Sequence, residues 1–305
     1  SGSLGVTQLL VDDFFMKNGK MPILGYNNSG NTQTVDINPE SAYSETGYST
    51  EDDVRATNWH YAVAGSKASG DSHVVAPKNT FNMYCNREPR FYISVVYNEQ
   101  YHWGKGKTTN FFFNGEDGQP SHDNPSAGYL IRKHVDPTFV HSTNTGTYKS
   151  RQGILYRLAE AYLSYAESAL EYSMAKGTYD VDKADIVKYI NKIRERAGIP
   201  QYGTSGLEIP TDPKEMRKLI RRERRVEMNC EGGLRWFDLR RWKEAEDVLD
   251  GNFYGMNMLA EKGNRDEFYK RVRYQTRKFK SYWWPIPQNE IDKNPNLKQM
   301  PGWMN

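Results

Sequence analysis

Apolar residues recur at helical spacing along two segments in the second half of the chain. Between residues 154 and 170 they follow one another mostly at intervals of three or four positions, and residues 186–197 repeat the pattern. Gly198 and Pro200 then supply a stop for the second segment. The pattern predicts two consecutive helices that pack as an antiparallel hairpin. The apolar positions are Ile154, Leu155, Leu158, Tyr162, Tyr165, Ala166, Ala169, Leu170, Ile186, Ile190, Ile193 and Ala197.

A hairpin of this length has the size of one tetratricopeptide-like unit. A single unit is too short for a free-standing solenoid, which normally stacks about three or more repeats. We therefore expect the hairpin to need neighbours that cover its remaining faces.

Two further helices are predicted after the hairpin. The first has Asp212 as N-cap, Pro213 in its first turn and Glu215 completing a capping box. The second is predicted from Leu234 to about Leu249, after the break at Gly232-Gly233.

The first half of the chain has a different character. From residue 26 to about residue 150 it is rich in Gly, Asn, Ser and Thr, and residues 90–97 form its main β-like run. A long irregular stretch of this kind indicates binding loops carried on a scaffold. We therefore divide the chain into a loop-rich ligand-binding region, residues 1–150, and a helical region, residues 151–305, within one compact unit.

Composition narrows the classes of function. The 305 residues carry 41 basic and 38 acidic side chains with a net charge of +3, and the basic residues are interspersed with acids, which disfavours nucleic-acid binding. Mean hydropathy is −0.84, and no apolar run approaches the roughly 18–20 residues of a membrane-spanning helix. The six histidines form no metal-binding pair and no phosphate-binding motif is present, so we predict no metal, cofactor or nucleic-acid partner.

The two cysteines fit no metal-binding spacing. Cys230 falls on an apolar helix stripe and is expected to be a small buried residue. Whether Cys85 and Cys230 form a disulfide stays open at this point.

Glu223 and Glu227 are the carboxylates that most invite a catalytic interpretation. They lie one turn apart on the apolar stripe of an arginine-rich helix, where carboxylates need cationic or hydrogen-bonding partners. We interpret them as members of a structural ion-pair network that includes Arg235 or Arg240, and assign no catalytic residues.

Aromatic residues cluster in polar segments of the loop-rich half. Flat rings flanked by polar side chains suit the stacking of sugar rings. We expect Trp59 and Trp103 to be the leading contacts with a ligand, and Tyr101 and His102 to be secondary contacts. The alternative is that these rings simply pack the loops onto the helices.

Several motifs, in order along the chain, resemble those of the SusD/RagB family. The arginine-rich helix of residues 220–231 is followed by LRWFDLRRW at residues 234–242, and the tail contains WPIP at 284–287, an Asn-Pro pair at 294–295 and QMPG at 299–302. Residues 86–92 resemble the family's "REPRF" segment, and residues 157–163 and 189–197 resemble its repeat helices. The resemblance extends from about residue 4 to residue 305.

The resemblance implies a mainly α fold of tetratricopeptide-like helical repeats with a large irregular, loop-rich ligand region. It also implies a non-catalytic protein of the bacterial cell surface, which captures a glycan for a SusC-like TonB-dependent transporter of the outer membrane. The only contact with the membrane that we expect is a lipid anchor, which lies outside this chain. We also expect the whole protein to contain N-terminal helical repeats that this chain lacks. Two alternatives stay open, namely a peptide-binding RagB-like uptake component and a glycoside hydrolase.

Overall fold

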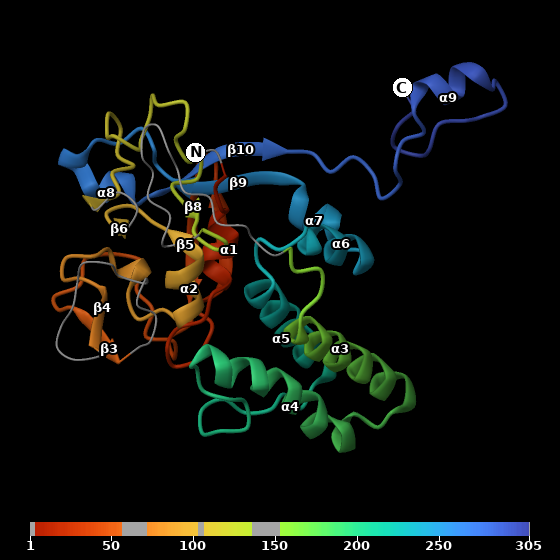
Figure 1. Ribbon diagram of the computed structural model, residues 1–305, viewed down its shortest axis with the longest axis horizontal. Helices are drawn as coiled ribbons and strands as arrows, with labels where there is room; N and C mark the ends of the chain where they lie inside the picture. The colour runs from red at the N-terminus through yellow and green to blue at the C-terminus, as the bar shows by residue number, and fades with distance from the viewer. Residues whose placement is uncertain (1–3, 57–71, 103–106, 136–152, 305) are drawn as a thin grey trace.

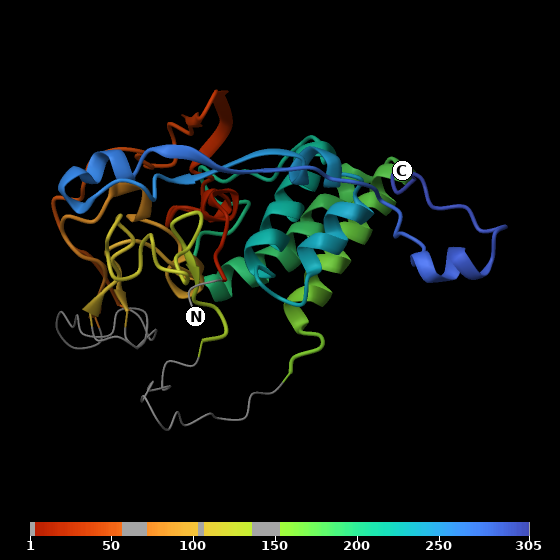
Figure 2. The same ribbon diagram turned by 90° about the horizontal axis from the view of Figure 1, so that it is seen from above.

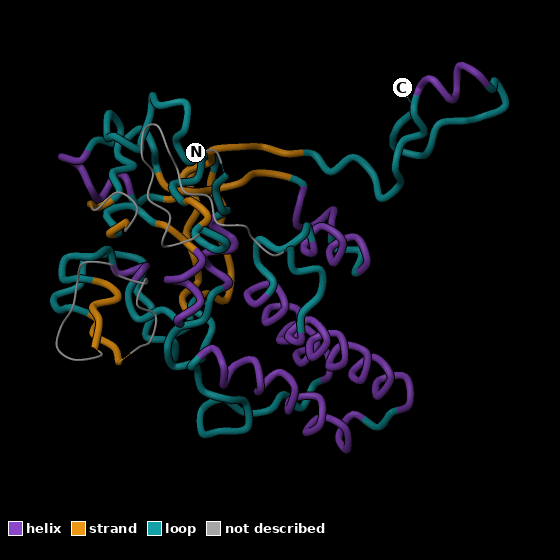
Figure 3. Tube along the Cα trace, in the orientation of Figure 1, coloured by secondary structure: helices purple, strands orange, loops and turns teal. Residues whose placement is uncertain are grey.

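The computed structural model describes residues 4–56, 72–102, 107–135 and 153–304. In this part of the chain the longer helices gather on one side of the molecule, and the strands and short helices lie on the other (Figures 1 and 3). A C-terminal segment that contains α9 (Gln288–Lys293) stands apart from both groups in two perpendicular views (Figures 1 and 2). The prediction of a mainly helical chain is therefore incomplete, because the molecule combines helices with a sheet.

The predicted helical hairpin is present. α3 (Leu158–Lys176) and α4 (Tyr179–Ala197) run antiparallel (Figure 1) and end at Gly177, with φ 70°, and Gly198, with φ 72°. Glycine suits these ends because other residues meet a steric penalty at positive φ. The shared core of the hairpin and the next helix contains Ala166, Leu170, Ile186, Ile190, Met216 and Ile220.

Two predictions about helix starts can be compared with the structure, one for the first helix of the hairpin and one for the helix that follows the hairpin. The predicted start of the first helix is wrong, because α3 begins at Leu158. Ile154 and Leu155 precede the helix and are exposed. The third predicted helix is α5 (Pro213–Glu227), and Asp212 accepts a hydrogen bond from the backbone N–H of Lys214 at 2.8 Å. The N-cap prediction is confirmed.

The fourth predicted helix is in fact two helices. α6 (Leu234–Arg241) is separated from α7 (Ala245–Leu249) by a turn in which Lys243 has φ 62°. A residue in the left-handed region interrupts a right-handed helix. The prediction of one continuous helix over this range is therefore wrong.

Neither cysteine is in a disulfide. Cys85 is buried and Cys230 is exposed, and both are free. The prediction that Cys230 is buried on the helix stripe is wrong, because α5 ends at Glu227 and Cys230 lies in the turn that follows, with φ 57°.

A four-stranded sheet that is not predicted from the sequence combines segments from the two ends of the chain. Its strands are β1 (Ile23–Ser29), β2 (Thr32–Ile37), β9 (Gly251–Met256) and β10 (Arg271–Arg277). Their order is β1-β2-β10-β9, and each neighbouring pair is antiparallel. The C-terminal strands are thereby fixed beside the N-terminal loops.

A buried arginine strengthens this connection. Arg271 of β10 lies 2.6 Å from Asp12 in α1 (Gln8–Asp13) and 2.5 Å from Glu45, in both cases between charged atoms. Arg271 and Asp12 are almost completely buried, so removing either partner would leave an unpaired charge in the interior.

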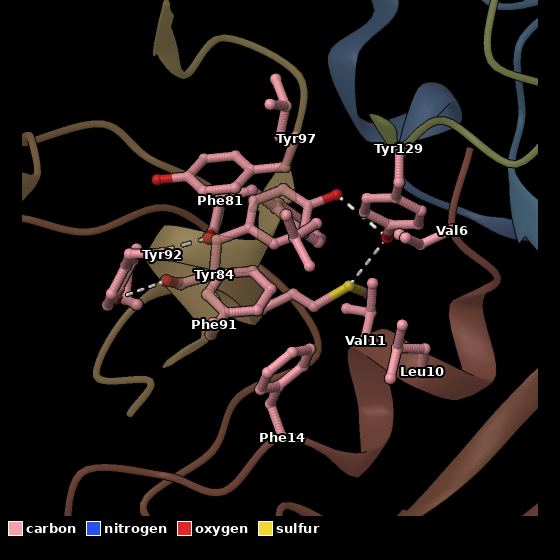
Figure 4. Packing of buried hydrophobic residues seen from close by; sticks show 14 of the residues in the cluster. Val6, Leu10, Val11, Phe14, Phe81, Tyr84, Phe91, Tyr92, Tyr97 and Tyr129 are labelled. Atoms are coloured by element: carbon pink, nitrogen blue, oxygen red, sulfur yellow. Dashed lines mark hydrogen bonds between the residues drawn. The ribbon is translucent and has the colours of Figure 1, made fainter. Parts of the chain in front are cut away.

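The largest core cluster is aromatic and lies in the half that the sequence marks as loop-rich. The rings of Tyr84 and Tyr97 stack with centroids 4.3 Å apart, and Phe14 meets Phe91 edge-on at 5.7 Å (Figure 4). All four side chains are buried. Irregular backbone in this half is therefore organised around a packed core rather than around open rings.

The β-like run predicted at residues 90–97 is mostly helical. α2 (Pro89–Ser94) precedes a short strand, β5 (Val95–Val96), which pairs with β8 (Leu130–Ile131). Proline in the first helical turn has a φ that suits a helix and gives up no hydrogen bond there. This local preference overrides the strand-like composition that follows.

The remaining elements are short. β6 and β7 form one antiparallel pair, β3 and β4 another, and α8 directly precedes β10. Their bounds are β3 (Asp53–Ala56), β4 (Ser72–Ala76), η1 (Asn82–Tyr84), β6 (Tyr101–His102), β7 (Lys107–Thr108), η2 (Lys262–Asn264) and α8 (Arg265–Phe268).

Candidate functional site

A polar pocket of about 380 Å³ opens between the loop-rich half and the segment around α8. Four stretches of chain that are distant in sequence contribute to its walls, and polar side chains predominate over apolar ones. The lining residues are Pro77, Lys78, Asn79, Thr80, Phe81, Asn98, Glu99, Lys107, Thr108, Thr109, Asn110, Phe112, Glu116, Lys262, Arg265 and Tyr269.

Stacked aromatic rings support one side of the pocket. Phe81 and Tyr269 are stacked with ring centroids 3.9 Å apart, and Tyr48 meets both edge-on at 5.6 and 6.2 Å. Phe81 and Tyr269 are buried, so they form a rigid base rather than an open platform.

Arg265, the first residue of α8, organises the polar part of the pocket. Its guanidinium donates to Glu99 Oε2 at 2.7 Å from Nη2 and to the carbonyl and Oδ1 of Asn79 at 3.0 and 3.3 Å. The same group lies over the ring of Tyr48, 4.1 Å from its centroid. These contacts hold Arg265 in one orientation at the pocket wall.

Two groups beside Arg265 have pKa values displaced by this environment. Burial opposes the charge of Arg265, but the Glu99 carboxylate outweighs it and raises the pKa of the guanidinium. Burial, followed by the charge of Glu99, raises the pKa of Tyr269. Tyr269 therefore stays protonated and its hydroxyl donates to Glu99 Oε2 at 3.1 Å.

Two residues that contact Arg265, Asn79 and Glu99, have strained backbone conformations. Asn79 has φ 71° and Glu99 has φ 64°. Asparagine adopts this region more readily than most residues, but glutamate does so rarely, and such conformations cost on the order of 1–3 kcal/mol each. The surrounding fold holds both residues in this conformation and so keeps them fixed beside Arg265.

The four predicted ligand contacts are placed as follows. Trp59 and Trp103 lie outside the described residues. Tyr101 and His102 form β6, where Tyr101 pairs with Thr108 and His102 pairs with Lys107. Thr108 and Lys107 line the pocket, whereas Tyr101 is not among the described residues that line it. Ligand contact by these four residues therefore stays a prediction, and it does not include the polar residues around Arg265.

The premise that the loop-rich half leaves many rings open does not hold for its described part. Tyr97, Phe111 and Phe112 belong to this half, and all three are almost completely buried. They belong to the largest core cluster, and their apolar faces are covered by protein.

Glu223 and Glu227 lie in a buried network of ion pairs. Arg90 approaches Glu88, Glu223 and Glu227 at 2.6, 2.7 and 3.0 Å. Arg194, with a fully buried side chain, lies 3.2 Å from Glu223. Paired in this way, the carboxylates avoid most of the penalty for isolated charges in the interior.

Glu227 has two further partners. Its Oε1 lies 2.6 Å from Nη1 of Arg157 and also pairs with Arg196. Burial alone would raise the pKa of Glu227, but the charges of Arg90 and Arg196 and the hydrogen bond from Arg157 lower it to about 2. Glu227 is therefore ionised at neutral pH and is unsuited to act as a proton donor.

Arg235 and Arg240 are not the partners of these two glutamates. Arg235 is half-buried, and burial followed by the charge of Arg225 lowers its pKa to about 10. Arg240 lies 5.1 Å from the ring centroid of Trp236 and 5.2 Å from that of Trp284, and it stabilises an aromatic face between α6 and the C-terminal segment. The prediction that either arginine pairs with the glutamates is wrong.

The described part of the chain contains neither a candidate metal-binding cluster nor a helix that could cross a membrane. In residues 4–56, 72–102, 107–135 and 153–304, no three His, Cys, Asp or Glu side chains are grouped so that they could bind a metal ion. Within the same residues, no helix has the length and apolarity needed to cross a membrane.

The sequence profile of the SusD family matches residues 1–303, and the chain belongs to this family. SusD-like protein P2 of Formosa agariphila is 30% identical over 156 residues, which cover 50% of this chain and 26% of that protein. The chain therefore matches only about a quarter of the length of this relative.

Solved structures share the fold. A SusD-like protein of Bacteroides fragilis has a TM-score of 0.64 and 26% identity, over 98% of this chain and 47% of its own. A SusD-like carbohydrate binding protein of the same organism has a TM-score of 0.59 and 19% identity, over 97% of this chain and 51% of its own. The chain spans about half the length of these solved relatives.

Proposed function

We propose that this chain is part of a non-catalytic cell-surface protein that captures an oligosaccharide for import through a SusC-like TonB-dependent transporter of the outer membrane. The observation that carries the proposal is the pocket around Arg265, in a chain of the SusD family. A relative with the same fold is a carbohydrate binding protein.

The chemistry of the pocket suits a sugar. Sugar hydroxyls both donate and accept hydrogen bonds, and the pocket offers carboxylate and amide oxygens beside amide, guanidinium and ammonium donors. Asn79, Glu99 and Arg265 are already oriented by one another, so little ordering is needed when a ligand binds. The strained backbone at the first two residues is consistent with a preformed site.

The ion pairs and hydrogen bonds of the carboxylates support a protein without catalytic activity. Glu223 and Glu227 are buried within ion pairs, and Glu99 accepts hydrogen bonds from both Arg265 and Tyr269. Glycoside hydrolysis needs a carboxylic acid that donates a proton as well as a carboxylate.

A peptide-binding, RagB-like role is the second candidate, because the same polar groups also recognise backbone amides.

We also propose that α3 and α4 are one tetratricopeptide-like unit of a longer stack. Leu158, Tyr165 and Tyr172 are seven residues apart on α3 and remain exposed, so they form an apolar stripe along one face. Because the solved relatives are about twice as long as this chain, we expect further helices of the same protein to cover the stripe.

A binding screen tests the proposed function. The chain is titrated with a panel of oligosaccharides and with a tetrapeptide panel, and reducing-sugar release is measured in the same mixtures. We expect binding to at least one glycan, no release of reducing ends and weaker or no peptide binding. Release that depends on Glu99 would make the protein a hydrolase, and binding to peptides alone would favour the RagB-like role.

A pocket variant localises the binding. Asn79→Gly removes an amide beside Arg265 and keeps a residue that tolerates φ 71°. We expect glycan affinity to fall about tenfold, equivalent to roughly 1.4 kcal/mol. Lys243→Gly is the matched control, because Lys243 also has positive φ and lies outside the pocket. Equal affinities in the two variants would place the ligand elsewhere.

Partnership is tested in membranes. The full-length protein should co-purify with a β-barrel transporter from outer membranes of the source cells. Recovery from the cytosol with no such partner would contradict the proposed role.

A further inference from the structure

Cationic side chains outnumber carboxylates on the walls of the pocket around Arg265. Among the described residues, four basic ones line it, namely Lys78, Lys107, Lys262 and Arg265, against two acidic ones, Glu99 and Glu116. The whole chain is close to neutral, with a net charge of +3 over 305 residues. Positive charge is therefore concentrated at this pocket relative to the chain as a whole.

Two of the four cations are already neutralised. Arg265 Nη2 lies 2.7 Å from Glu99 Oε2, and Lys107 pairs with Glu116. These pairs use both carboxylates that line the pocket.

The other two cations, Lys78 and Lys262, have no ion-pair partner in the part of the chain that the structure describes. Both are exposed, and they come from separate segments, one before Asn79 and one in η2. Asp52, near Lys78 in space, accepts a hydrogen bond from the Lys78 backbone N–H at 2.5 Å. Both ammonium groups are therefore available to a ligand.

Unpaired ammonium groups around a pocket favour a ligand of the opposite charge. The surrounding protein lowers the local dielectric constant, so a carboxylate or sulfate in the pocket interacts more strongly than it would in bulk water. A neutral sugar offers only hydroxyl groups and gains nothing from the excess charge.

We propose that this pocket selects an anionic oligosaccharide, one whose sugars carry carboxylate or sulfate ester groups, with Lys78 and Lys262 as the residues that set the preference. The proposal rests on the proposed function, since it specifies the ligand of the same pocket. Arg265 and Glu99 hold the polar wall in place, and the two lysines contact the acidic substituents.

Matched pairs of glycans test the proposal. One pair is an oligogalacturonate and its methyl ester, which loses the charge but keeps the sugar ring. The other pair is a sulfated galactan oligosaccharide and its desulfated form. We expect the charged member of at least one pair to bind about tenfold or more tightly, and its affinity to fall as salt rises from about 50 to about 500 mM. The pair that shows the difference identifies carboxylate or sulfate as the recognised group.

The double variant Lys78→Gln/Lys262→Gln assigns the preference to these lysines. It should bind the charged and neutral members of each pair about equally, because both unpaired cations are gone. The control is Lys278→Gln/Lys298→Gln, which removes two exposed lysines of the C-terminal segment that do not line the pocket. The control should retain the full preference for the charged member.

Three results would overturn the proposal and leave glycan capture intact. They are equal binding of charged and neutral members, a preference that survives in the double variant, and an equally tight interaction with a polyglutamate peptide. Binding to no glycan on the wider panel would instead contradict the proposed function itself. The two failures are therefore distinguishable.

Discussion

Arg90 contacts three glutamate side chains at once, and this arrangement explains why an arginine-rich helix carries acidic residues on its buried face. Glu223 has Arg90 and Arg194 as partners, and Glu227 has Arg90, Arg157 and Arg196. The network joins α2, α4 and α5 in the interior. Its carboxylates have the environment of structural ion pairs rather than that of catalytic acids.

Removing Glu227 should destabilise the fold. We expect Glu227→Ala to lower the free energy of unfolding by about 3–5 kcal/mol, because buried arginines lose a partner. Denaturant titration followed by circular dichroism measures the change. Glu215→Ala on the same helix is the control, because Glu215 is exposed and water screens its pair with Lys218, so its loss should hardly change the stability. A loss no larger than that of the control would contradict the structural role.

The same residue gives a prediction for pH. The pKa of Glu227 is lowered from 4.5 to about 2, so its ionised form stabilises the fold above pH 4.5, and that stabilisation is lost as the pH falls toward 2. Burial raises the pKa of neighbouring Glu88, so Glu88 acts in the opposite direction and is left unchanged in the comparison. The stability difference between the wild type and Glu227→Gln should therefore shrink between pH 4.5 and pH 2. A difference that stays constant over this interval would show that the charge of Glu227 is not what stabilises the fold.

Trp103 carries the sequence-based prediction for ligand contact. It directly follows β6, whose partner strand lines the pocket. Stacking on a sugar is expected to be worth roughly 1–3 kcal/mol, by analogy with nucleobases. We expect Trp103→Ala to weaken glycan binding about tenfold while the melting temperature hardly changes. Unfolding of the variant, or normal binding, would show that Trp103 packs against protein instead.

Elements with strong local signals are predicted well from the sequence. Asp212 caps α5, and Gly198 ends α4, because each property depends on neighbouring residues alone. The four-stranded sheet escapes prediction because β1 is mostly exposed and its second half is polar, which leaves no clear alternation. Its pairing also joins residues as distant as Thr32 and Val272.

The candidate site escapes prediction for the same reason. Arg265 and Glu99 are 166 residues apart, and nothing near either residue in the sequence signals the contact. The turn signal in Pro77-Lys78-Asn79 was available, but it indicates a turn and not a ligand. Only the fold brings these polar segments together.

The end of α4 gives a prediction at the scale of an element. Gly198 has φ 72°, and an alanine there would adopt the left-handed conformation at a cost of about 1–2 kcal/mol. We expect Gly198→Ala to lower the free energy of unfolding by that amount. Gly263→Ala is the control, since its φ is not positive and an added Cβ would meet nothing within 4 Å. Equal stabilities of the two variants would contradict the assigned backbone conformation.

In the whole molecule, the pocket and the aromatic face lie on different parts of the structure. The pocket involves β7 and α8, whereas Trp236, Phe237, Trp283 and Trp284 remain exposed on and near α6. Figure 1 shows α8 and α6 well separated, with the sheet strands β9 and β10 extending between their regions. Large exposed rings of this kind are typical of surfaces that contact other protein segments. Because the aromatic face near α6 is separate from the pocket, a protein segment bound to that face would leave the pocket open to a ligand.

Hydrogen–deuterium exchange with and without a bound glycan tests the central claim most directly. If the pocket is the binding site, the glycan should slow exchange in residues 77–81, 98–99, 107–110 and 262–269, which line it, and leave α3 and α4 unchanged. Slower exchange confined to the helical hairpin or to the aromatic face of α6, with none in the pocket segments, would contradict the account.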